Sequence, residues 1–171
     1  MVELTIQHYL AGLAMMIISG GMLVHIFQDV FKIIGRKQLR RYKSRLYRHT
    51  RAIYELMPKD QFIMGKGLWN QKCHQNSVQA LQEGTATKVI LCIAREGMNV
   101  FVHYINQTED GKYVDNTLGW QYKEFEYYFI REIREEEYME LPYHIGIMND
   151  TNLKQFTRWP WRKYITKETE K

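Results

Sequence analysis

Cysteine is scarce in this chain. Only two of its 171 residues are cysteines, Cys73 and Cys92, which is too few for a disulfide framework, so nothing points to an oxidising compartment. Cys92 lies in the apolar run KVILCIA, which is typical of a buried thiol. The chain also has no glycine-rich phosphate loop, no paired-carboxylate pattern of a glycosidase and no HExxH motif. These absences exclude the corresponding enzyme classes, and we expect no cofactor.

Acidic residues are missing from one long stretch. Between Lys32 and Arg51 the chain has nine Lys or Arg and no Asp or Glu. From Met57 to Lys171 it has 15 basic and 16 acidic residues, a formal charge of −1. The net charge of +5 therefore belongs to one segment. A composition of 45% hydrophobic and 13% aromatic residues indicates a folded protein.

Formal charge is missing from the 19 residues between Tyr9 and Phe27, apart from any that His25 carries. A bilayer core accommodates about 20 apolar residues in a helix, so residues 1–31 are predicted to form an apolar, transmembrane helix. A buried hairpin helix or the core of an oligomer is the alternative. A cleaved signal peptide is disfavoured, because no Lys or Arg precedes the segment and no small-residue cleavage site precedes the basic run.

Residues 32–57 are predicted to form a basic juxtamembrane helix, since apolar residues recur among the basic ones at near-helical spacing. By the positive-inside rule this helix stays in the cytoplasm, which predicts a single-pass membrane protein with a cytoplasmic C-terminal domain. Anionic lipid is the favoured partner and nucleic acid the second choice. The residues expected at the membrane surface are Arg36, Lys37, Arg40, Arg41, Lys43, Arg45 and Arg48.

Residues 58–171 are predicted to form one α+β domain, since Pro58 and a Gly-x-Gly pair mark a boundary. The segment NQKCHQNSVQALQEG indicates a helix that ends at Gly84, and TKVILCIAR a central strand. NVFVHYIN and KYVDNT form a hairpin around Asp110 and Gly111. EFEYYFIREIREEEYMEL is predicted to be an amphipathic helix, whose apolar side consists of Phe125, Tyr128, Phe129, Ile133 and Tyr138.

Three chemically matched residues follow one another along this pattern: Cys73 at a helix start, His103 on a strand and Asp115 on the returning strand. A helix N-terminus lowers the pKa of a thiol, a neighbouring imidazole takes its proton, and a carboxylate orients the imidazole. His103 and Asp115 lie twelve residues apart across the hairpin turn, where their side chains share one face. The pattern predicts a Cys-His-Asp triad.

The order and spacing of this triad resemble the transglutaminase-like branch of the papain-like cysteine hydrolase clan. In that branch a helix-borne cysteine precedes a strand with an HxW motif, and an aspartate follows in a WVDPT-like strand. The corresponding segments here, KCHQNSVQAL, VFVHYIN and KYVDNTLGW, cover about residues 68–120. The resemblance implies a core helix packed on a small antiparallel sheet, with Cys73 as nucleophile, His103 as general base and acid, and Asp115 as the orienting carboxylate.

The chain departs from that family at two places. Tyr104 and Ile105 replace a small residue and the Trp of HxW, and Asn116 replaces the Pro. No oxyanion donor stands at a recognisable position, so the Cys73 N–H is the default donor. The residues that are candidates to complete the oxyanion hole or to support the triad are Trp69, Asn70, Gln71, His74 and Asn116. A zinc site from Cys73, His74 and His103 is a weaker alternative, because no fourth ligand follows at a suitable spacing.

These observations predict a membrane-anchored thiol hydrolase or acyltransferase that attacks an amide or peptide bond, with hydrolysis and transamidation equally open. One alternative is a catalytically inactive member of the fold that serves as a membrane-tethered binding or assembly module. Another is a nucleic-acid-binding protein that uses the basic helix and has an oligomer core at its N-terminus. A cell-wall peptidase is disfavoured, because the basic segment places the domain on the cytoplasmic side.

Overall fold

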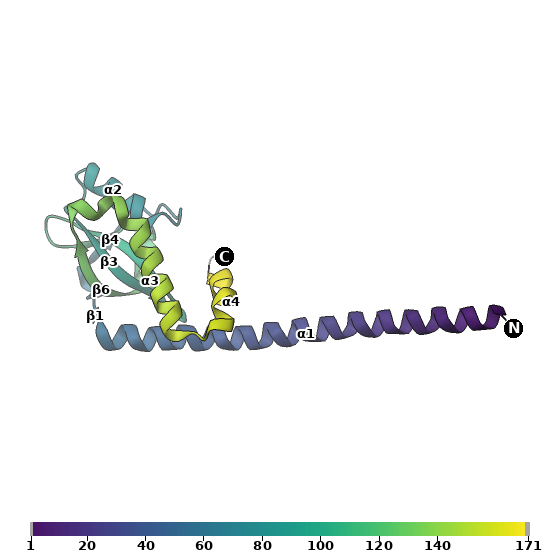
Figure 1. Cartoon of the computed structure of the whole chain (residues 1–171). Helices are drawn as coiled ribbons and strands as arrows, with labels where there is room; N and C mark the ends of the chain where they lie inside the picture. The colour runs from purple at the N-terminus through teal and green to yellow at the C-terminus, as the bar shows by residue number, and fades with distance from the viewer. Residues whose placement is uncertain (1, 170–171) are drawn as a thin grey trace.

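A computed structural model of the chain describes the backbone of residues 2–169 and the side chains of residues 24–167. It has one very long helix, α1 (Val2–Ile53), that leads into an α+β domain. Figure 1 shows α1 extending far beyond the domain, which stands on the C-terminal end of the helix. The predicted apolar and basic helices are therefore two parts of one continuous helix.

A six-stranded sheet forms the centre of the described domain, in the order β1-β6-β3-β4-β5-β2. Its strands are β1 (Glu55–Leu56), β2 (Phe62–Met64), β3 (Lys88–Glu96), β4 (Asn99–Gln107), β5 (Tyr113–Asp115) and β6 (Glu126–Ile133). The pairs are antiparallel except β2–β5, which is parallel. The sheet is thus mixed, whereas the resemblance implied a purely antiparallel one. Its first strand, β1, precedes the predicted domain start at residue 58.

Helices cover one face of the sheet. The helix α2 (Cys73–Gln82) and the helix α3 (Leu141–Phe156), which has Pro142 in its first turn, pack on Leu91, Val102 and Tyr104. The opposite face carries a second core around Ile90, Cys92 and Tyr127, closed by the 3-10 helices η1 (Lys59–Gln61) and η2 (Gly119–Glu124) and the segments beside them. The strongly apolar β3 is therefore covered on both sides, as its sequence predicts.

The C-terminal helices attach α1 to the domain. Tyr42 and Leu46 of α1 are buried against Ile165 of α4 (Trp159–Thr169), and Leu153, Phe156 and Val100 complete this third core. Lys43 Nζ also donates a hydrogen bond to Asn99 Oδ1 at 2.8 Å, which joins α1 to the β3–β4 hairpin. The basic part of α1 is consequently a structural wall of the domain.

The prediction of an amphipathic helix in EFEYYFIREIREEEYMEL is wrong. This segment forms β6, followed by the 3-10 helix η3 (Glu135–Glu140). Aromatic and β-branched residues favour a strand, but β6 is covered on both faces, so its apolar residues do not alternate with polar ones. Adjacent Tyr127 and Tyr128 are both buried. Because apolar residues lie on both faces of this strand, their spacing along the sequence matches that of an amphipathic helix, which explains the wrong prediction.

The other predicted elements agree with the structure. The helix begins at Cys73, and Gly84 follows its end with a φ of +68°, as a C-terminal glycine does. The central strand and the hairpin are β3, β4 and β5. Where the side chains are described, no helix is both long and apolar enough to cross a bilayer. Most of the segment predicted to cross, Tyr9–Phe27, lies outside those residues.

Candidate active site

The segment before α2 is held by a network of side-chain amides. Asn70 and Asn76 exchange two amide hydrogen bonds of 3.0 and 2.8 Å, and Asn76 Nδ2 also donates to Thr117 Oγ1 at 2.9 Å. The backbone N–H of Lys72 donates to Asn70 Oδ1 at 3.1 Å. These bonds fix the start of α2, where Cys73 is the first helical residue and its N–H belongs to the group that no helical carbonyl accepts.

The same segment is tied to the residues that follow Asp115. Trp69 and Gln71 have φ angles of 51° and 55°, a left-handed conformation that costs free energy for any residue other than glycine. The Leu68 and Trp69 N–H groups donate to the carbonyls of Asn116 and Thr117, both at 3.0 Å. The strain is thus supported by contacts that place the cysteine loop beside the aspartate loop.

A pair of glycines permits this approach. Gly67 and Gly119 lie so close that a Cβ on Gly119 would come within 2.5 Å of the Gly67 Cα, and both have a positive φ. Only glycine avoids a clash at such a separation. The two loops that carry Cys73 and Asp115 therefore contact each other through their backbones.

His103 and Asp115 form a buried pair. Nε2 of His103 and Oδ2 of Asp115 lie 2.8 Å apart, and the two residues are only 3% and 0% exposed. Burial alone would lower the pKa of His103, but the charge and hydrogen bond of Asp115, together with Cys73, raise it to about 10. The predicted contact across the hairpin is confirmed, and the imidazole is held as an imidazolium.

Asp115 is fully supplied with donors. Its Oδ1 accepts the N–H groups of Thr117 at 2.9 Å and Leu118 at 2.8 Å, and its Oδ2 accepts the hydroxyl of Tyr127 at 2.7 Å. Burial alone would raise the pKa of Asp115, but His103 and these donors keep it below its usual value. Burial and the Asp115 charge raise the pKa of Tyr127, so its hydroxyl stays a donor.

The thiol of Cys73 interacts with the imidazole of His103. Burial alone would raise the pKa of Cys73, but the hydrogen bond and charge of His103, with help from the Tyr104 N–H, hold it below its ordinary value. β5 pairs with β4 only at Asn106 and Gln107, so no β5 residue pairs with the part of β4 that carries His103. Since Nε2 of His103 faces Asp115, the nitrogen left for the thiol is Nδ1.

A cavity of about 920 Å³ opens beside this pair, a size that suits a ligand site. Cys73 and His103 lie in its lining together with Trp69 and Gln71. One wall comes from α1 and another from α3, and the tip of the β3–β4 hairpin completes it; these parts contribute Tyr42, Lys43, Leu46, Ile145, Asn149, Leu153, Glu96 and Asn99. Cys73, which is 7% exposed, thus lies in the wall of a cleft of which α1 forms one side.

The predicted supporting residues divide into two groups. Trp69 and Gln71 line the cleft, whereas Asn70 belongs to the network that fixes the start of α2. Asn116 Oδ1 accepts the N–H of Lys66 at 3.3 Å, and its Nδ2 donates to Asn106 Oδ1 at the same distance. His74 is half-buried outside the cleft lining, and burial and the charge of Lys72 lower its pKa.

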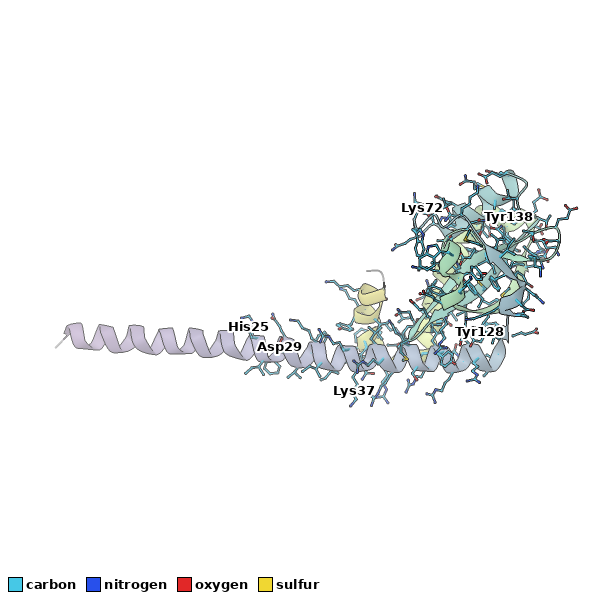
Figure 2. The ribbon with its side chains drawn as sticks, turned by 180° about the vertical axis from the view of Figure 1, so that it is seen from behind. His25, Asp29, Lys37, Lys72, Tyr128 and Tyr138 are labelled. Carbon is cyan, nitrogen blue, oxygen red and sulfur yellow. The ribbon has the colours of Figure 1, made fainter. Side chains whose placement is uncertain are left out.

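The predicted basic residues also divide. Arg36, Lys37, Arg40, Arg41, Arg45 and Arg48 are exposed on α1. Lys37 points away from the side of α1 on which α4 and the domain stand (Figure 2). Lys43 is different, because it lines the cleft and binds Asn99. Within the described residues, none of these seven side chains forms an ion pair with a carboxylate.

Three parts of the site were not predicted from the sequence. Tyr127 was missed because its segment was interpreted as a helix with Tyr128 facing the core. The role of Asn76 and Thr117 depends on a contact between residues 41 positions apart, which has no local signal. The cleft wall from α3 lies in a region of the sequence with no legible pattern. Only the glycines of GKG and LGW give a hint, as sites of close backbone approach.

No protein-family model, curated protein or solved structure matches the chain. Among the residues that the structure describes, no group of three or more His, Cys, Asp or Glu is arranged to hold a metal ion. The arrangement of Cys73, His103 and Asp115 is therefore interpreted from its own chemistry.

Proposed function

We propose that this chain is a membrane-anchored thiol hydrolase or acyltransferase that acts on an amide or peptide bond through Cys73, His103 and Asp115. One observation carries the proposal. A buried carboxylate is bonded to Nε2 of His103, whose other nitrogen serves the cleft-lining Cys73 thiol. A thiol with a lowered pKa beside an imidazolium is the activated nucleophile of cysteine hydrolases.

The chemistry follows from the positions of the protons. The Cys73 thiolate attacks the carbonyl carbon, and the developing oxyanion is placed near the free N–H of Cys73, with Gln71 as a second donor from the cleft lining. The carbon–nitrogen bond then breaks while His103 gives its proton to the leaving amine. A thioester of Cys73 remains, and the amine leaves neutral.

The second half of the reaction regenerates the thiolate. Neutral His103 removes a proton from water or from an acceptor amine, which attacks the thioester and releases Cys73. Water gives hydrolysis and an amine gives transamidation. Asp115 holds the imidazole in one orientation throughout, because its Oδ2 is fixed by Tyr127 and its Oδ1 by two backbone N–H groups.

The proposal includes the fold family. A cysteine at the start of a helix, a histidine on a central strand and an aspartate on the neighbouring strand are the elements of the transglutaminase-like branch of the papain-like clan. The contact through Nδ1 of His103 fits that arrangement. The parallel β2–β5 pair and the long α1 are additions to it.

Membrane anchoring rests on α1. Beyond the uncharged residues of the N-terminal segment, the described side chains Phe27, Val30, Phe31, Ile33 and Ile34 are exposed, and the unpaired basic residues follow directly. Exposed apolar side chains, of which only Phe31 is described in ring contact with α4, followed by clustered Lys and Arg suit a bilayer with anionic headgroups on the cytoplasmic side. The basic residues also favour nucleic acid as a second candidate partner.

The proposal is tested by the pH dependence of Cys73 alkylation. Full-length protein with Cys92→Ala is treated with iodoacetamide across pH 5 to 10, and the same is done after adding His103→Ala. We expect an apparent pKa below the free-thiol value of about 8.5 in the first protein and a higher one in the second. If the pKa of Cys73 is unshifted and does not change when His103 is replaced, the proposal fails, and a catalytically inactive binding module becomes the better interpretation.

Acyl transfer itself is tested with p-nitrophenyl acetate. The Cys92→Ala protein should release a burst of p-nitrophenol equal in moles to the protein. Mass spectrometry should then show an acetyl group on Cys73. His103→Ala should lose the burst. A reactive thiol without any burst would indicate a cleft that does not stabilise the oxyanion.

A further inference from the structure

The C-terminal helix α4 crosses α1 at a defined place. The ring of Trp161 lies 5.1 Å from the ring of Phe31, and Tyr164 meets Phe31 edge-on at 5.9 Å. Tyr164 also covers Gly35, where an added Cβ would lie 2.5 Å from its ring. Figure 1 shows α4 projecting sideways from α1, between the domain and the N-terminal half of the helix. The crossing point is where the apolar part of α1 becomes basic.

The exposed side chains of α4 are aromatic and basic. Trp159, at its first position, is 80% exposed. Residues 158–167 contain four basic side chains and no acid: Arg158, Arg162, Lys163 and Lys167. Arg162 donates to the carbonyls of Thr157 and Lys154, both at 3.2 Å, so it is held at the start of α4. Trp and Tyr interleaved with Lys and Arg is the composition of a membrane–water interface.

We propose that α4 is an interfacial collar that rests against an anionic bilayer surface where α1 enters it. Three observations point to one plane: the exposed apolar side chains that occur between residues 24 and 34, interrupted by the Asp29–Lys32 ion pair, end there, the basic residues without a carboxylate partner begin there, and α4 places Trp159 there. A helix that crosses the anchor at this point lies along the surface rather than through it. The inference rests on the anchoring part of the proposed function.

The collar sets the height of the catalytic cleft. Tyr42, Lys43 and Leu46 form the α1 wall of the cleft, 11 to 15 residues beyond Phe31, which is about 16–22 Å along a helix that rises about 1.5 Å per residue. Thr166 of α4 also lines the cleft, so the cleft extends from the collar to this level, and Cys73 would act on amide bonds within roughly 20 Å of the headgroups. This distance makes the membrane-proximal segments of other membrane-anchored proteins the proposed substrate class.

Lipid fits this surface better than nucleic acid. A nucleic-acid site needs basic residues placed along a phosphate track, and stacking aromatics face the bases. Here Trp161 and Tyr164 are packed on α1, and the exposed apolar residues Phe27 and Ile33 continue the surface on the N-terminal side. Apolar side chains of that kind gain nothing from a phosphate backbone, whereas the acyl region of a bilayer accommodates them.

The collar is tested by tryptophan quenching in vesicles of phosphatidylcholine and phosphatidylglycerol. Full-length single-tryptophan proteins retain Trp159 or Trp120, with the other three tryptophans changed to Phe. Trp120 is a matched control: it is 57% exposed on η2, which lies by β2 and β5 at the sheet edge opposite β1. A third protein has all four tryptophans changed to Phe and carries Phe27→Trp.

We expect lipids brominated near the headgroup to remove most of the Trp159 emission, and lipids brominated in the upper part of the acyl chain to remove most of the emission from position 27, which lies about 6 Å below Phe31 along the helix. Trp120 should be unaffected. Quenching at position 27 without quenching of Trp159 would overturn the collar but leave the anchor. No quenching at either position, with salt-dependent quenching of Trp159 by duplex DNA, would overturn both in favour of nucleic acid.

The height of the cleft is tested with lipid-tethered iodoacetamide in vesicles that carry the Cys92→Ala protein. A tether that reaches about 30 Å should alkylate Cys73, and one that reaches about 10 Å should do so much more slowly, since 3.3–3.6 Å per residue is the limit of an extended peptide spacer. Free iodoacetamide shows whether the thiol is reactive, independently of the tether. Equal labelling with both tethers would overturn the proposed height.

Discussion

The two cysteines occupy regions of the domain that differ in one decisive respect, although both contact His103. Cys92 lies in the middle of β3, with its Sγ 3.5 Å from the backbone carbonyl of His103. Its burial, together with the charge of Asp115, raises its pKa well above the usual value. Cys73 lies at the start of α2, where it meets the ring of His103, and its pKa is lowered. Contact with the ring, in the wall of a cleft, separates a nucleophile from a core residue.

The difference is a property of the sheet rather than of the residue type. A thiol inside a continuous ladder meets backbone groups that are already paired, and nothing there stabilises a thiolate. The short β5 pairs with β4 only at Asn106 and Gln107, so His103 lies on a part of β4 that has no β5 partner, and α2 packs on the face of the sheet nearby.

The largest effect is expected when Cys73, the reactive one of the two cysteines, is replaced. Cys73→Ser should abolish modification by iodoacetamide at pH 7, because the other thiol, Cys92, is 0% exposed, does not line the cleft and has a raised pKa. Cys92→Ala should change the rate of Cys73 alkylation by no more than about twofold, since the reactivity of a thiol depends on its own thiolate fraction and on its own access to the reagent. Mass spectrometry of the intact protein counts the modified thiols. Labelling of Cys92 in the folded Cys73→Ser protein would contradict the comparison.

The part of the site that was predicted from the sequence is local. Cys73 at a helix start and His103 opposite Asp115 depend on periodicity and on one tight hairpin turn, and each of these is encoded within about a dozen residues. The structure places all three residues accordingly. The alternation of β4 was legible because one set of side chains, from Phe101 to Ile105, faces a different core from the other.

The part that could not be predicted depends on contacts between distant segments. Tyr127 reaches Asp115 only because β6 is a strand, and its sequence has a helical spacing of apolar residues. The amide network of Asn70, Asn76 and Thr117 joins positions that no periodic pattern relates. Lys43 was predicted to face lipid but lines the cleft, because packing of α1 on the domain turns one side of the basic helix inward.

Asp115→Asn should have the next largest effect, because it keeps the shape of the site but removes its charge. The pKa of His103 is raised to about 10 mainly by Asp115, against the effect of burial, so the neutral amide should let the imidazolium lose its proton at lower pH. Without the charge of the imidazolium, the thiolate of Cys73 is no longer stabilised. We expect alkylation of Cys73 at pH 6 to slow by about tenfold or more, since a bond to a charged group contributes about 1.5–3 kcal/mol.

The ¹⁵N chemical shifts of the His103 ring check this cause directly. At pH 8 the ring should be protonated in the Cys92→Ala protein and neutral once Asp115→Asn is added. The sign of the stability effect also follows. A raised pKa of His103 contributes stability that is complete below the unfolded value of about 6.5 and is lost as the pH rises through about 10. Asp115→Asn should therefore flatten the fall in stability between pH 7 and pH 10.

Tyr127→Phe should have the smallest effect of the three, because Tyr127 acts on the thiol only through Asp115 and His103. Burial raises the pKa of Asp115, whereas His103, then the Leu118 N–H and the Tyr127 hydroxyl keep it below its usual value. A depressed pKa contributes stability that is present above the unfolded value and is lost as the pH falls through the folded one. The variant should therefore lose about 1–3 kcal/mol at pH 7 and less near pH 3.

Tyr113→Phe is the matched control for this last effect. The Tyr113 ring packs on Phe62 at 5.4 Å, as the Tyr127 ring does at 4.6 Å, but its hydroxyl donates to no other described residue. Urea unfolding at the two pH values should show a pH-dependent loss for Tyr127→Phe and none for Tyr113→Phe. In the same proteins, alkylation of Cys73 should slow by about two- to fivefold only in Tyr127→Phe, since the lower part of the range of about 0.5–1.5 kcal/mol for one neutral donor applies to a group that acts through Asp115 and His103. Equal behaviour of the two variants would reduce Tyr127 to a packing residue and leave Asp115 oriented by its backbone donors alone.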